Sequence, residues 1–383
     1  MQPELVDTPE ALAALGALAR GAPEIALDTE SNSLHAWREK VCVLQLALCG
    51  RIFLVDTVVL RDLSPLRAAF EDERITKVLH GADYDVVCLK RDFGFGPAPI
   101  FDTMLAAQML GHEAFGLAAV VERFTGVRLD KAHTKHDWGA RPLLPQVIPY
   151  LVDDVLHLAE VAANLRAEIE NAGIAEEIAL EFRRVEQLAW GGDNRMDPEA
   201  WRRVKGLRHL DPANHGIMRE LFQWREERAE AMDRPAFKIM GNDVLFAISE
   251  RRPQARRELC GISGLPPRLL ERHGHALLCC VQRGLVHPAE AAPRPPRRTA
   301  FDHLRAACDD ALRNWRREIV QATGVNPLVV LPNHVLQRIA EERPEDAAAL
   351  AGIAGLGVHR HERHAAQILA VLQAAQREVE DKS

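Results

Sequence analysis

Residues 24–58 read EIALDTESNSLHAWREKVCVLQLALCGRIFLVDTV, and this stretch decides the fold of the first half of the chain. The short run Ile25-Ala26-Leu27 and the longer run from Val41 to Leu48 are apolar, as buried strands are. Ile52-Phe53-Leu54-Val55 follows after Gly50-Arg51, which is a short turn containing glycine. The last two runs therefore predict an antiparallel hairpin.

The rest of the first half is predicted to be mostly helical. One short strand, Lys77-Val78-Leu79-His80, interrupts the helices between residues 60 and 170. Asn171-Ala172-Gly173 is a helix stop, and a long helix is expected from Ile174 to about Trp190. Strands mixed with helices in this way favour an α/β domain.

An acidic pair, Asp28 and Glu30, closes the first predicted strand. Residues two apart in a strand face the same side, so the two carboxylates point together. They repel each other, and a bound divalent cation would offset the repulsion. The alternative is a pair of exposed acids at a strand end.

Two further acidic positions carry possible chemistry. Asp85 falls in the first turn of a helix after the strand 77–80, where an acid also pairs favourably with the helix dipole. Tyr150 and Asp154 are four residues apart and share one helix face, while Asp153 is expected to point away from it. The alternative for this pair is an ordinary amphipathic helix with solvated acids.

Taken together, these elements resemble the DEDD exonuclease superfamily in its tyrosine-bearing subgroup. The shared pattern is Asp-x-Glu on a strand, an Asp at a helix start in mid-domain, and Tyr-x-x-x-Asp on a late helix. The flanks resemble the ribonuclease D family at Lys77-Val78-Leu79-His80-Gly81-Ala82-Asp83-x-Asp85, Phe101-Asp102-Thr103-Met104, Leu44-Gln45-Leu46 and Asp137-Trp138-x-x-Arg141-Pro142-Leu143.

The resemblance implies a ribonuclease H-like α/β domain with a mixed central sheet over residues 1–190. In that family four carboxylates hold two divalent ions, Mg²⁺ or Mn²⁺, and they correspond here to Asp28, Glu30, Asp85 and Asp154. Tyr150 would orient the attacking water, because a phenol with a pKa of about 10 is better suited to hydrogen bonding than to acting as a base. His80 and Lys135 are candidate RNA contacts, although a packed or solvated side chain is the alternative for both.

The chain departs from the family pattern around the helix that carries Tyr150. The family has Ser or Thr as the helix cap where Leu144 stands, and Pro149 would remove a helix bond if the helix had already begun. The helix is therefore expected to start late or to be kinked. After Glu30 the chain has Ser31, at a place where the family often has an aromatic residue. This difference would alter how the terminal nucleotide is bound.

The strongest internal signal is a gapless repeat with a spacing of 91 residues. Matched positions include Trp224 with Trp315, Arg225 with Arg316, Asn242-x-Val244-Leu245 with Asn333-x-Val335-Leu336, Arg252-Pro253 with Arg343-Pro344, Leu259-x-Gly261-Ile262-x-Gly264-Leu265 with Leu350-x-Gly352-Ile353-x-Gly355-Leu356, and Glu271-Arg272-His273 with Glu362-Arg363-His364. The two asparagines are expected to cap helices, the prolines to stop them, and the glycines to form a tight junction. Two copies with a linker indicate a tandem duplication of a small helical domain.

Each copy resembles the HRDC domain shared by RecQ-type helicases and ribonuclease D. The likeness rests on Arg234-Pro235-Ala236-Phe237-Lys238-Ile239-x-x-Asn242-x-x-Leu245 and the glycine junction that follows. The expected boundaries are 205–286 for the first copy, 287–301 for a linker rich in Pro and Arg, and 302–375 for the second copy. HRDC domains usually bind or position nucleic acid, and packing spacers are the alternative.

The charge distribution agrees with this layout. Residues 1–195 hold 19 Lys and Arg against 30 Asp and Glu, whereas residues 201–300 hold 19 against 11. An acidic first half suits a carboxylate-rich metal site, and a basic middle suits a polyanion.

Arg251, Arg252, Arg256 and Arg257 in the first copy are the predicted RNA contacts. Changing all four to Glu should lower RNA affinity and its dependence on salt. Unchanged affinity and salt dependence in a binding titration would contradict this prediction.

Composition excludes several other classes of protein. No apolar run approaches the roughly 18 residues that cross a bilayer, and the acidic N-terminal segment is unlike a signal peptide. Seven cysteines without a Cys-x-x-Cys pair predict reduced thiols and a cytoplasmic location. The sequence has no P-loop, so ATP-driven helicase activity is not expected. Nothing in it demands more than a monomer or an obligate protein partner.

Three functions remain open at this point. The first is a metal-dependent 3′–5′ exoribonuclease that trims RNA 3′ ends, with transfer RNA precursors as the usual substrate of the family. The second is a 3′–5′ DNA exonuclease, because the same four carboxylates can support hydrolysis of DNA as well as of RNA. The third is an RNA-binding protein whose nuclease domain is impaired by the proline-distorted helix.

Overall fold

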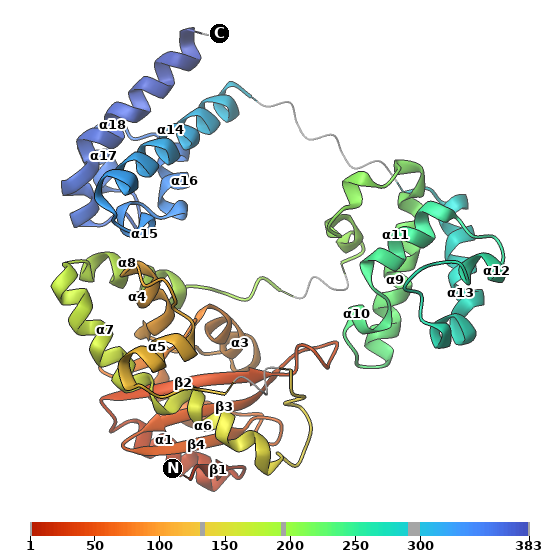
Figure 1. Ribbon diagram of the computed structural model, residues 1–383, viewed down its shortest axis with the longest axis horizontal. Coiled ribbons are helices and arrows are strands. Elements are labelled where there is room, and N and C mark those ends of the chain that lie inside the picture. The colour runs from red at the N-terminus through yellow and green to blue at the C-terminus, as the bar shows by residue number, and fades with distance from the viewer. Residues whose placement is uncertain (1, 131–134, 193–196, 290–298, 382–383) are drawn as a thin grey trace.

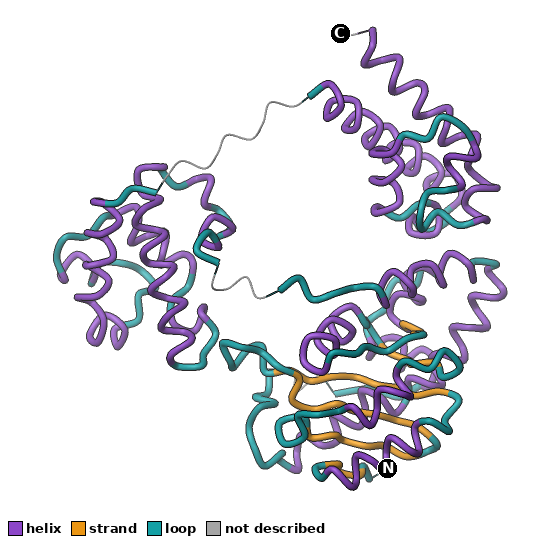
Figure 2. The backbone as a smooth tube through the Cα atoms, turned by 180° about the vertical axis from the view of Figure 1, so that it is seen from behind, coloured by secondary structure: helices purple, strands orange, loops and turns teal. Residues whose placement is uncertain are grey.

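A computed structural model describes residues 2–130, 135–192, 197–289 and 299–381. The described residues form three large hydrophobic cores and one small one. The first large core lies almost wholly within residues 6–185, the other two fall mainly within 200–281 and 308–375, and the small one lies within 42–151. Strands occur in the first of these regions, and the described residues of the other two are helical with loops (Figures 1 and 2). The expected order of an α/β part followed by two helical parts is confirmed.

One mixed sheet of six strands forms the centre of the first part, in the order β1-β4-β3-β2-β5-β6. Its strands are β1 (Glu4–Val6), β2 (Glu24–Ser31), β3 (Val41–Leu48), β4 (Arg51–Asp56), β5 (Thr76–Leu79) and β6 (Ile100–Asp102). β3 runs antiparallel to both β2 and β4, which confirms the predicted hairpin, and the other pairs are parallel. A register shift between Glu30 and Ser31 ends the regular pairing of β2.

Helices cover both faces of this sheet, which explains why β3 is apolar on both faces apart from Gln45. They are α1 (Pro9–Ala19), α2 (Ser64–Phe70), α3 (Asp83–Phe93), α4 (Thr103–Met109), α5 (Leu117–Thr125), α6 (Ile148–Leu156), α7 (Leu158–Ala172) and α8 (Ala175–Glu186), with a 3₁₀ turn at Pro145–Val147. Leu44 and Leu46 of β3 join the main core, while Cys42 and Val43 pack with Leu151 of α6. The predicted helix from residue 174 is shorter than expected, since α8 ends at Glu186.

The two helical modules repeat one arrangement. The first has 3₁₀ turns at Ala200–Arg203, Leu207–His209 and Pro212–Asn214, then α9 (His215–Ala231), α10 (Ala236–Ile239), α11 (Asn242–Arg251), α12 (Arg256–Leu259) and α13 (Pro267–Val286). The second has α14 (Ala300–Thr323), α15 (Pro327–Val330), α16 (Asn333–Glu342), α17 (Ala347–Ala351) and α18 (Val358–Asp381). Matched rings also pack alike. The ring centroids of Trp224 and His273 lie 5.5 Å apart, and those of Trp315 and His364 lie 5.4 Å apart.

The predicted asparagine caps are wrong in both copies. Asn242 and Asn333 are the first residues of α11 and α16, and neither helix has a side-chain cap. The Oδ1 atom of Asn242 instead accepts from Arg225, 2.7 Å away, and that of Asn333 accepts from Arg316, 2.9 Å away. The repeat therefore preserves an arginine–asparagine bond between helices, a contact between residues 17 apart that helix-end rules do not describe.

The second helical module packs against the nuclease-like part through α8. The Glu176 carboxylate accepts hydrogen bonds from the backbone N–H groups of Val358 and His359, at 2.8 and 2.7 Å, and so caps α18. Arg363 pairs with the buried Glu177 at 3.0 Å, and Val329 belongs to the first core. The start of α18 is thus fixed by its contacts with α8.

Among the residues that the structure describes, no helix combines the length and the apolar character needed to cross a membrane.

Candidate active site

Three carboxylates meet where α6 packs against the inner strand β2. Asp28 and Glu30 come from β2, and Asp154 comes from α6. One oxygen from each lies within 4.8 Å of the others. The alternation along β2 brings the first two together as predicted, and the packing of α6 across β2, β3 and β4 adds the third.

The helix that carries Tyr150 starts late, as the two prolines predicted. Pro145 opens a 3₁₀ turn, and α6 begins only at Ile148. Pro149 therefore falls in the first turn, where its missing N–H breaks no helix bond. Tyr150 is hydrogen-bonded to Glu30, and its ring stacks on that of Trp138 with centroids 5.8 Å apart. The tyrosine consequently lies beside the carboxylate cluster.

Asp85 lies next to these three carboxylates in the first turn of α3. Its side chain is 5% exposed, and its Oδ1 atom accepts a hydrogen bond from the Thr29 hydroxyl, between the two acids of β2. Its charge is the second largest cause, after burial, of the raised pKa of Asp28. The structure thus places the fourth predicted ligand near the site and hydrogen-bonded to Thr29, but outside the group of three whose oxygens lie within 4.8 Å of one another.

Asp102 holds the turn that leads into α3, and sequence reasoning missed this role. It caps α4, with Oδ1 accepting from Met104 and Leu105. The same carboxylate accepts from the N–H groups of Gly81 and Ala82 at 2.9 and 2.8 Å. Its position at a strand end before a helix is the signal that could have identified it.

A second missed residue is Gln45 of β3. It is the cross-strand partner of Asp28 and is fully buried. Neither Oε1 nor Nε2 has a hydrogen-bond partner among the described residues. A glutamine within the apolar run Val41–Leu48 is the signal in the sequence, because burying an unpaired amide is costly.

Burial and mutual repulsion shift the titration of the whole cluster. Burial above all, then the charges of the neighbouring acids, raises the pKa of Glu30 to about 8. Burial likewise raises the pKa of Asp85 and of Asp154 to about 7 each, and that of Asp28 well above its usual range. Burial, followed by the charges of Asp154 and Glu30, also raises the pKa of Tyr150, so its hydroxyl stays protonated.

These donors fit a divalent cation. All are carboxylate oxygens, the ligand type that Mg²⁺ and Mn²⁺ prefer. The Oδ2 atom of Asp154 is buried without a hydrogen-bond partner among the described residues, so it is free to bind a metal ion. Burial first, and then repulsion, makes the charged form of these acids unfavourable, and a bound cation would offset both effects. Metal binding therefore gives a reason for so costly an arrangement.

The raised pKa values predict that the metal-free protein loses stability as pH rises. A carboxyl whose folded pKa exceeds its unfolded value near 4 stabilises the fold at low pH and loses that contribution as pH rises through the folded pKa. The pH range over which this stability is lost extends from about 4 to about 8, which is the folded pKa of Glu30. In EDTA, the Tm should be lower at about pH 8.5 than at about pH 6, and Mg²⁺ should raise the Tm more at the higher pH. A metal-free Tm that rises over this interval would contradict the prediction.

A hollow of about 410 Å³ opens beside the cluster. Tyr150, Asp153 and Asp154 line it together with Asp130 and with small or apolar residues such as Gly116 and Leu117. Asp153, expected to point away from the face shared by Tyr150 and Asp154, therefore lines this hollow with them. Its size and mixed lining suit one nucleoside.

The predicted RNA contacts differ in their settings. His80 is hydrogen-bonded to Thr103 at 2.9 Å, its Nε2 atom is buried, and burial lowers its pKa to about 4. It is thus neutral, and RNA contact would require the ring to become exposed. Lys135 is exposed, and its carbonyl oxygen lies 3.1 Å from Nε2 of His35.

The four arginines of the first helical module fall into two pairs. Arg251 donates to the carbonyl of Gly261 at 2.6 Å, and Arg252 donates to Asn214 at 2.5 Å. Arg256 and Arg257 of α12 are exposed. The first pair therefore already stabilises the fold of the module, and RNA contact by any of the four stays a prediction.

Comparison with known proteins agrees with this geometry. Residues 3–170 match a family of 3′–5′ exonucleases, and residues 214–281 and 305–372 match the HRDC domain. Ribonuclease D of Nitrobacter hamburgensis is 30% identical over 355 residues, which are 91% of each chain. Ribonuclease D of Escherichia coli is 31% identical over 303 residues, covering 77% of this chain and 78% of that protein.

Solved structures support the same assignment. The crystal structure of Escherichia coli RNase D, described as an exoribonuclease involved in structured RNA processing, aligns with a TM-score of 0.68 and 26% identity over 98% of this chain and 99% of that one. The catalytic core of RRP6 from Trypanosoma brucei aligns with a TM-score of 0.66 and 27% identity over 75% and 81%. The exonuclease family is metal-dependent, in agreement with the carboxylate cluster. The chain therefore belongs to the ribonuclease D family and is a 3′–5′ exoribonuclease with two HRDC domains.

Proposed function

We propose that this exoribonuclease removes nucleotides from the 3′ ends of transfer RNA precursors with the help of two divalent ions, Mg²⁺ or Mn²⁺. The observation that carries the proposal is the cluster of Asp28, Glu30 and Asp154 beside a hollow of nucleoside size. A hollow of about the size of one nucleoside suits a single-stranded 3′ end.

The metal ligands in this proposal are Asp28, Glu30, Asp85 and Asp154. When bound, the ions would polarise the scissile phosphate and lower the pKa of the attacking water. The protein contributes fixed oxygens, since β2, α3 and α6 all belong to the packed first part of the chain. The Thr29 hydroxyl holds Asp85 in place through its hydrogen bond.

Tyr150 acts as a positioning donor in this proposal. Its raised pKa keeps the hydroxyl protonated at neutral pH, so it donates a hydrogen bond and does not act as a base. Glu30 receives that bond in the metal-free protein. In the complex the hydroxyl orients the attacking water.

Tyr150→Phe should lower kcat about 10²-fold, with little change in Tm. The ring keeps its stacking on Trp138, and only the hydroxyl is lost. One positioned hydrogen bond near the reacting atoms is worth about 10²-fold or more in rate. Single-turnover kinetics on a 5′-labelled RNA would measure the loss, and a wild-type rate for Tyr150→Phe would remove the residue from the mechanism.

The substrate class is tested with matched oligonucleotides. A transfer RNA precursor with a 3′ extension, a single-stranded RNA and a DNA of the same sequence are incubated with protein and Mg²⁺ or Mn²⁺. The proposal expects the highest kcat/KM for the extended precursor and clearly slower trimming of DNA. Equal or faster trimming of DNA would favour the alternative of a DNA exonuclease.

The reason for expecting an RNA-binding protein with an impaired nuclease domain no longer holds. It assumed that Pro149 distorts the helix that carries Tyr150 and Asp154, whereas α6 begins at Ile148 and brings both residues to the cluster. Turnover in the same experiment decides between hydrolysis and simple binding. We propose that the protein acts as a monomer without an obligate partner.

A further inference from the structure

The buried amide of Gln45 is a polar group that the fold alone does not explain. Gln45 lies in the middle of β3 and is fully buried. Neither its Oε1 atom nor its Nε2 atom has a hydrogen-bond partner among the described residues, although the amide has two donor hydrogens and an acceptor oxygen. Burying such a group without a partner costs free energy, and the binding of a ligand is one reason to retain it.

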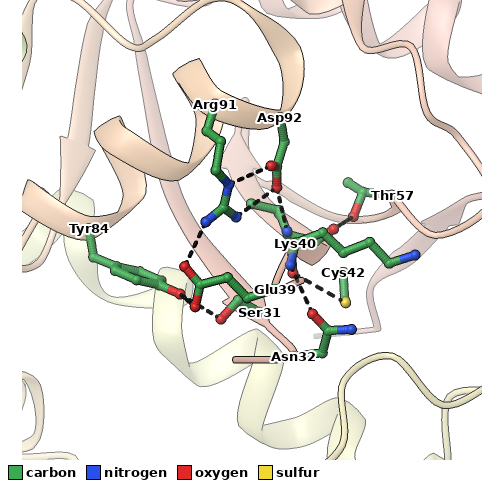
Figure 3. Close-up of polar contacts among 10 residues, drawn as sticks. Ser31, Asn32, Glu39, Lys40, Cys42, Thr57, Tyr84, Arg91 and Asp92 are labelled. Atoms are coloured by element: carbon green, nitrogen blue, oxygen red, sulfur yellow. Dashed lines mark hydrogen bonds and ion pairs between the residues drawn. The ribbon is translucent and has the colours of Figure 1, made fainter. Parts of the chain in front are cut away.

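Polar side chains around the start of the same strand do have partners, as Figure 3 shows. The Thr57 hydroxyl donates to the carbonyl oxygen of Val41, the first residue of β3, at 2.7 Å. The Oδ1 atom of Asn32 accepts from the backbone N–H of Lys40 at 2.9 Å. Polar groups in this part of the sheet are thus paired within the protein, and Gln45 departs from this pattern within the same strand.

The strand register places Gln45 beside the carboxylate cluster. It is the direct cross-strand partner of Asp28 in the antiparallel pair of β2 and β3. Side chains of directly opposed residues point to the same face of the sheet, and their Cβ atoms lie about 4.5–5.5 Å apart. This spacing is within the reach of a glutamine side chain, so the amide can meet the Asp28 carboxylate.

The neighbours of Gln45 on β4 do not supply the missing partner. Its cross-strand partner there is Leu54, which belongs to the small core beside α6. Asp56 lies two residues further along β4, but its two carboxylate oxygens accept from Arg141 at 2.5 and 2.8 Å. The acceptor that the register places next to the amide is therefore Asp28.

Asp28 in turn lacks the side-chain donor that two other acids of the site have. The Thr29 hydroxyl donates to Asp85, and the Tyr150 hydroxyl is bonded to Glu30. Among the described residues no side chain donates to Asp28, whose hydrogen bond comes from the backbone of Thr29. A side chain that hydrogen-bonds to a metal-binding group fixes its orientation, and its loss typically lowers metal affinity about 10- to 100-fold. The opposed amide is the donor that would complete the set.

We propose that Gln45 is a positioning residue of the metal site, whose Nε2 atom donates a hydrogen bond to the Asp28 carboxylate when a divalent cation is bound. A bound ion restricts the direction of the carboxylate, and the amide then has an acceptor in a constant place. Gln45 orients the ligand and does not itself bind the ion. The inference rests on the proposed function, since it needs Asp28 to bind a metal ion.

Removing the amide should therefore have opposite effects on the metal-free protein and on metal binding. The test compares Gln45→Met with wild type, because methionine has a similar size and shape but lacks the amide. The Tm in EDTA should rise by about 2 °C or more, since an unpaired buried group is removed. The Kd for Mg²⁺, measured by titration calorimetry without RNA, should rise about tenfold.

Hydrolysis of a 5′-labelled RNA gives a second measure of the same effect. The rate that Gln45→Met loses at low Mg²⁺ should return when Mg²⁺ is raised about tenfold, because the amide acts on metal binding. Thr57→Val is the matched control, since it removes a buried hydroxyl that does have a partner. It should lower the Tm in EDTA and leave the Kd for Mg²⁺ at the wild-type value.

A wild-type Kd for Mg²⁺ in Gln45→Met would overturn the proposal. So would a Tm in EDTA that falls as in Thr57→Val, because a merely structural role of the amide predicts that fall. Gln45→Leu keeps the test decisive if the methionine variant does not fold, and it should shift both quantities in the same directions. Failure of the proposed function is a separate result: wild-type protein would then neither bind Mg²⁺ nor cleave RNA, and the inference would be overturned with it.

Discussion

Asp28→Asn is expected to lower kcat/KM for RNA 3′-end hydrolysis by about 10³-fold or more and to raise the Tm of the metal-free protein. Loss of a metal ligand removes several kcal/mol of transition-state stabilisation, and each 1.36 kcal/mol is tenfold in rate. The gain in Tm arises because the amide ends the repulsion among Asp28, Glu30 and Asp154. Activity is measured on a 5′-labelled RNA, and Tm is measured in EDTA.

The matched control for this variant is Asp7→Asn, which removes the same charge from an exposed position of the same domain. It should leave both quantities unchanged. Asp28→Asn with wild-type turnover would contradict the assignment of the cluster as the metal site. A fall in the metal-free Tm would contradict the electrostatic account of the cluster.

Asp102→Ala should destabilise the first domain by about 3 kcal/mol or more. The side chain is 1% exposed and accepts four backbone hydrogen bonds, from Gly81, Ala82, Met104 and Leu105. A buried donor left without an acceptor costs about 1–3 kcal/mol, with partial relief from water. Activity should fall as well, because the turn before α3 places Asp85.

Asp102→Asn separates the two effects. The amide oxygen can still serve Gly81, Met104 and Leu105, while the amide nitrogen faces the N–H of Ala82. We therefore expect a loss of about half the size in the free energy of unfolding, measured by urea denaturation. Equal stability of wild type and Asp102→Ala would show that this carboxylate does not hold the turn.

Local patterns in the sequence predicted much of the site. The two-residue period of a strand placed Asp28 and Glu30 on one face, and the four-residue period of a helix placed Tyr150 with Asp154. The prolines around Tyr150 correctly predicted a late helix start, because proline chemistry acts within one turn. Such features depend only on residues that are close in the sequence, so they can be predicted from the sequence.

Features that join distant segments were missed or misjudged. Asn242 was predicted to be a helix cap, yet its side chain bonds to Arg225 of α9. Arg251 and Arg252 stand in a basic cluster in the sequence, yet their side chains bond to Gly261 and to Asn214, which the sequence did not indicate. Likewise Trp37 joins a core whose other members begin at residue 200. These contacts depend on tertiary packing, which cannot be predicted from the periodicity of residues within one segment.

We attribute the metal-dependent 3′–5′ exoribonuclease activity of this chain to the cluster of Asp28, Glu30 and Asp154. A 5′-labelled single-stranded RNA with a free 3′-hydroxyl is incubated with the protein and Mg²⁺ or Mn²⁺, beside EDTA and Asp28→Asn controls. We expect a ladder of progressively shorter 5′-labelled products that is absent in both controls. Uncut RNA with either metal, or an equal ladder in EDTA, would contradict it.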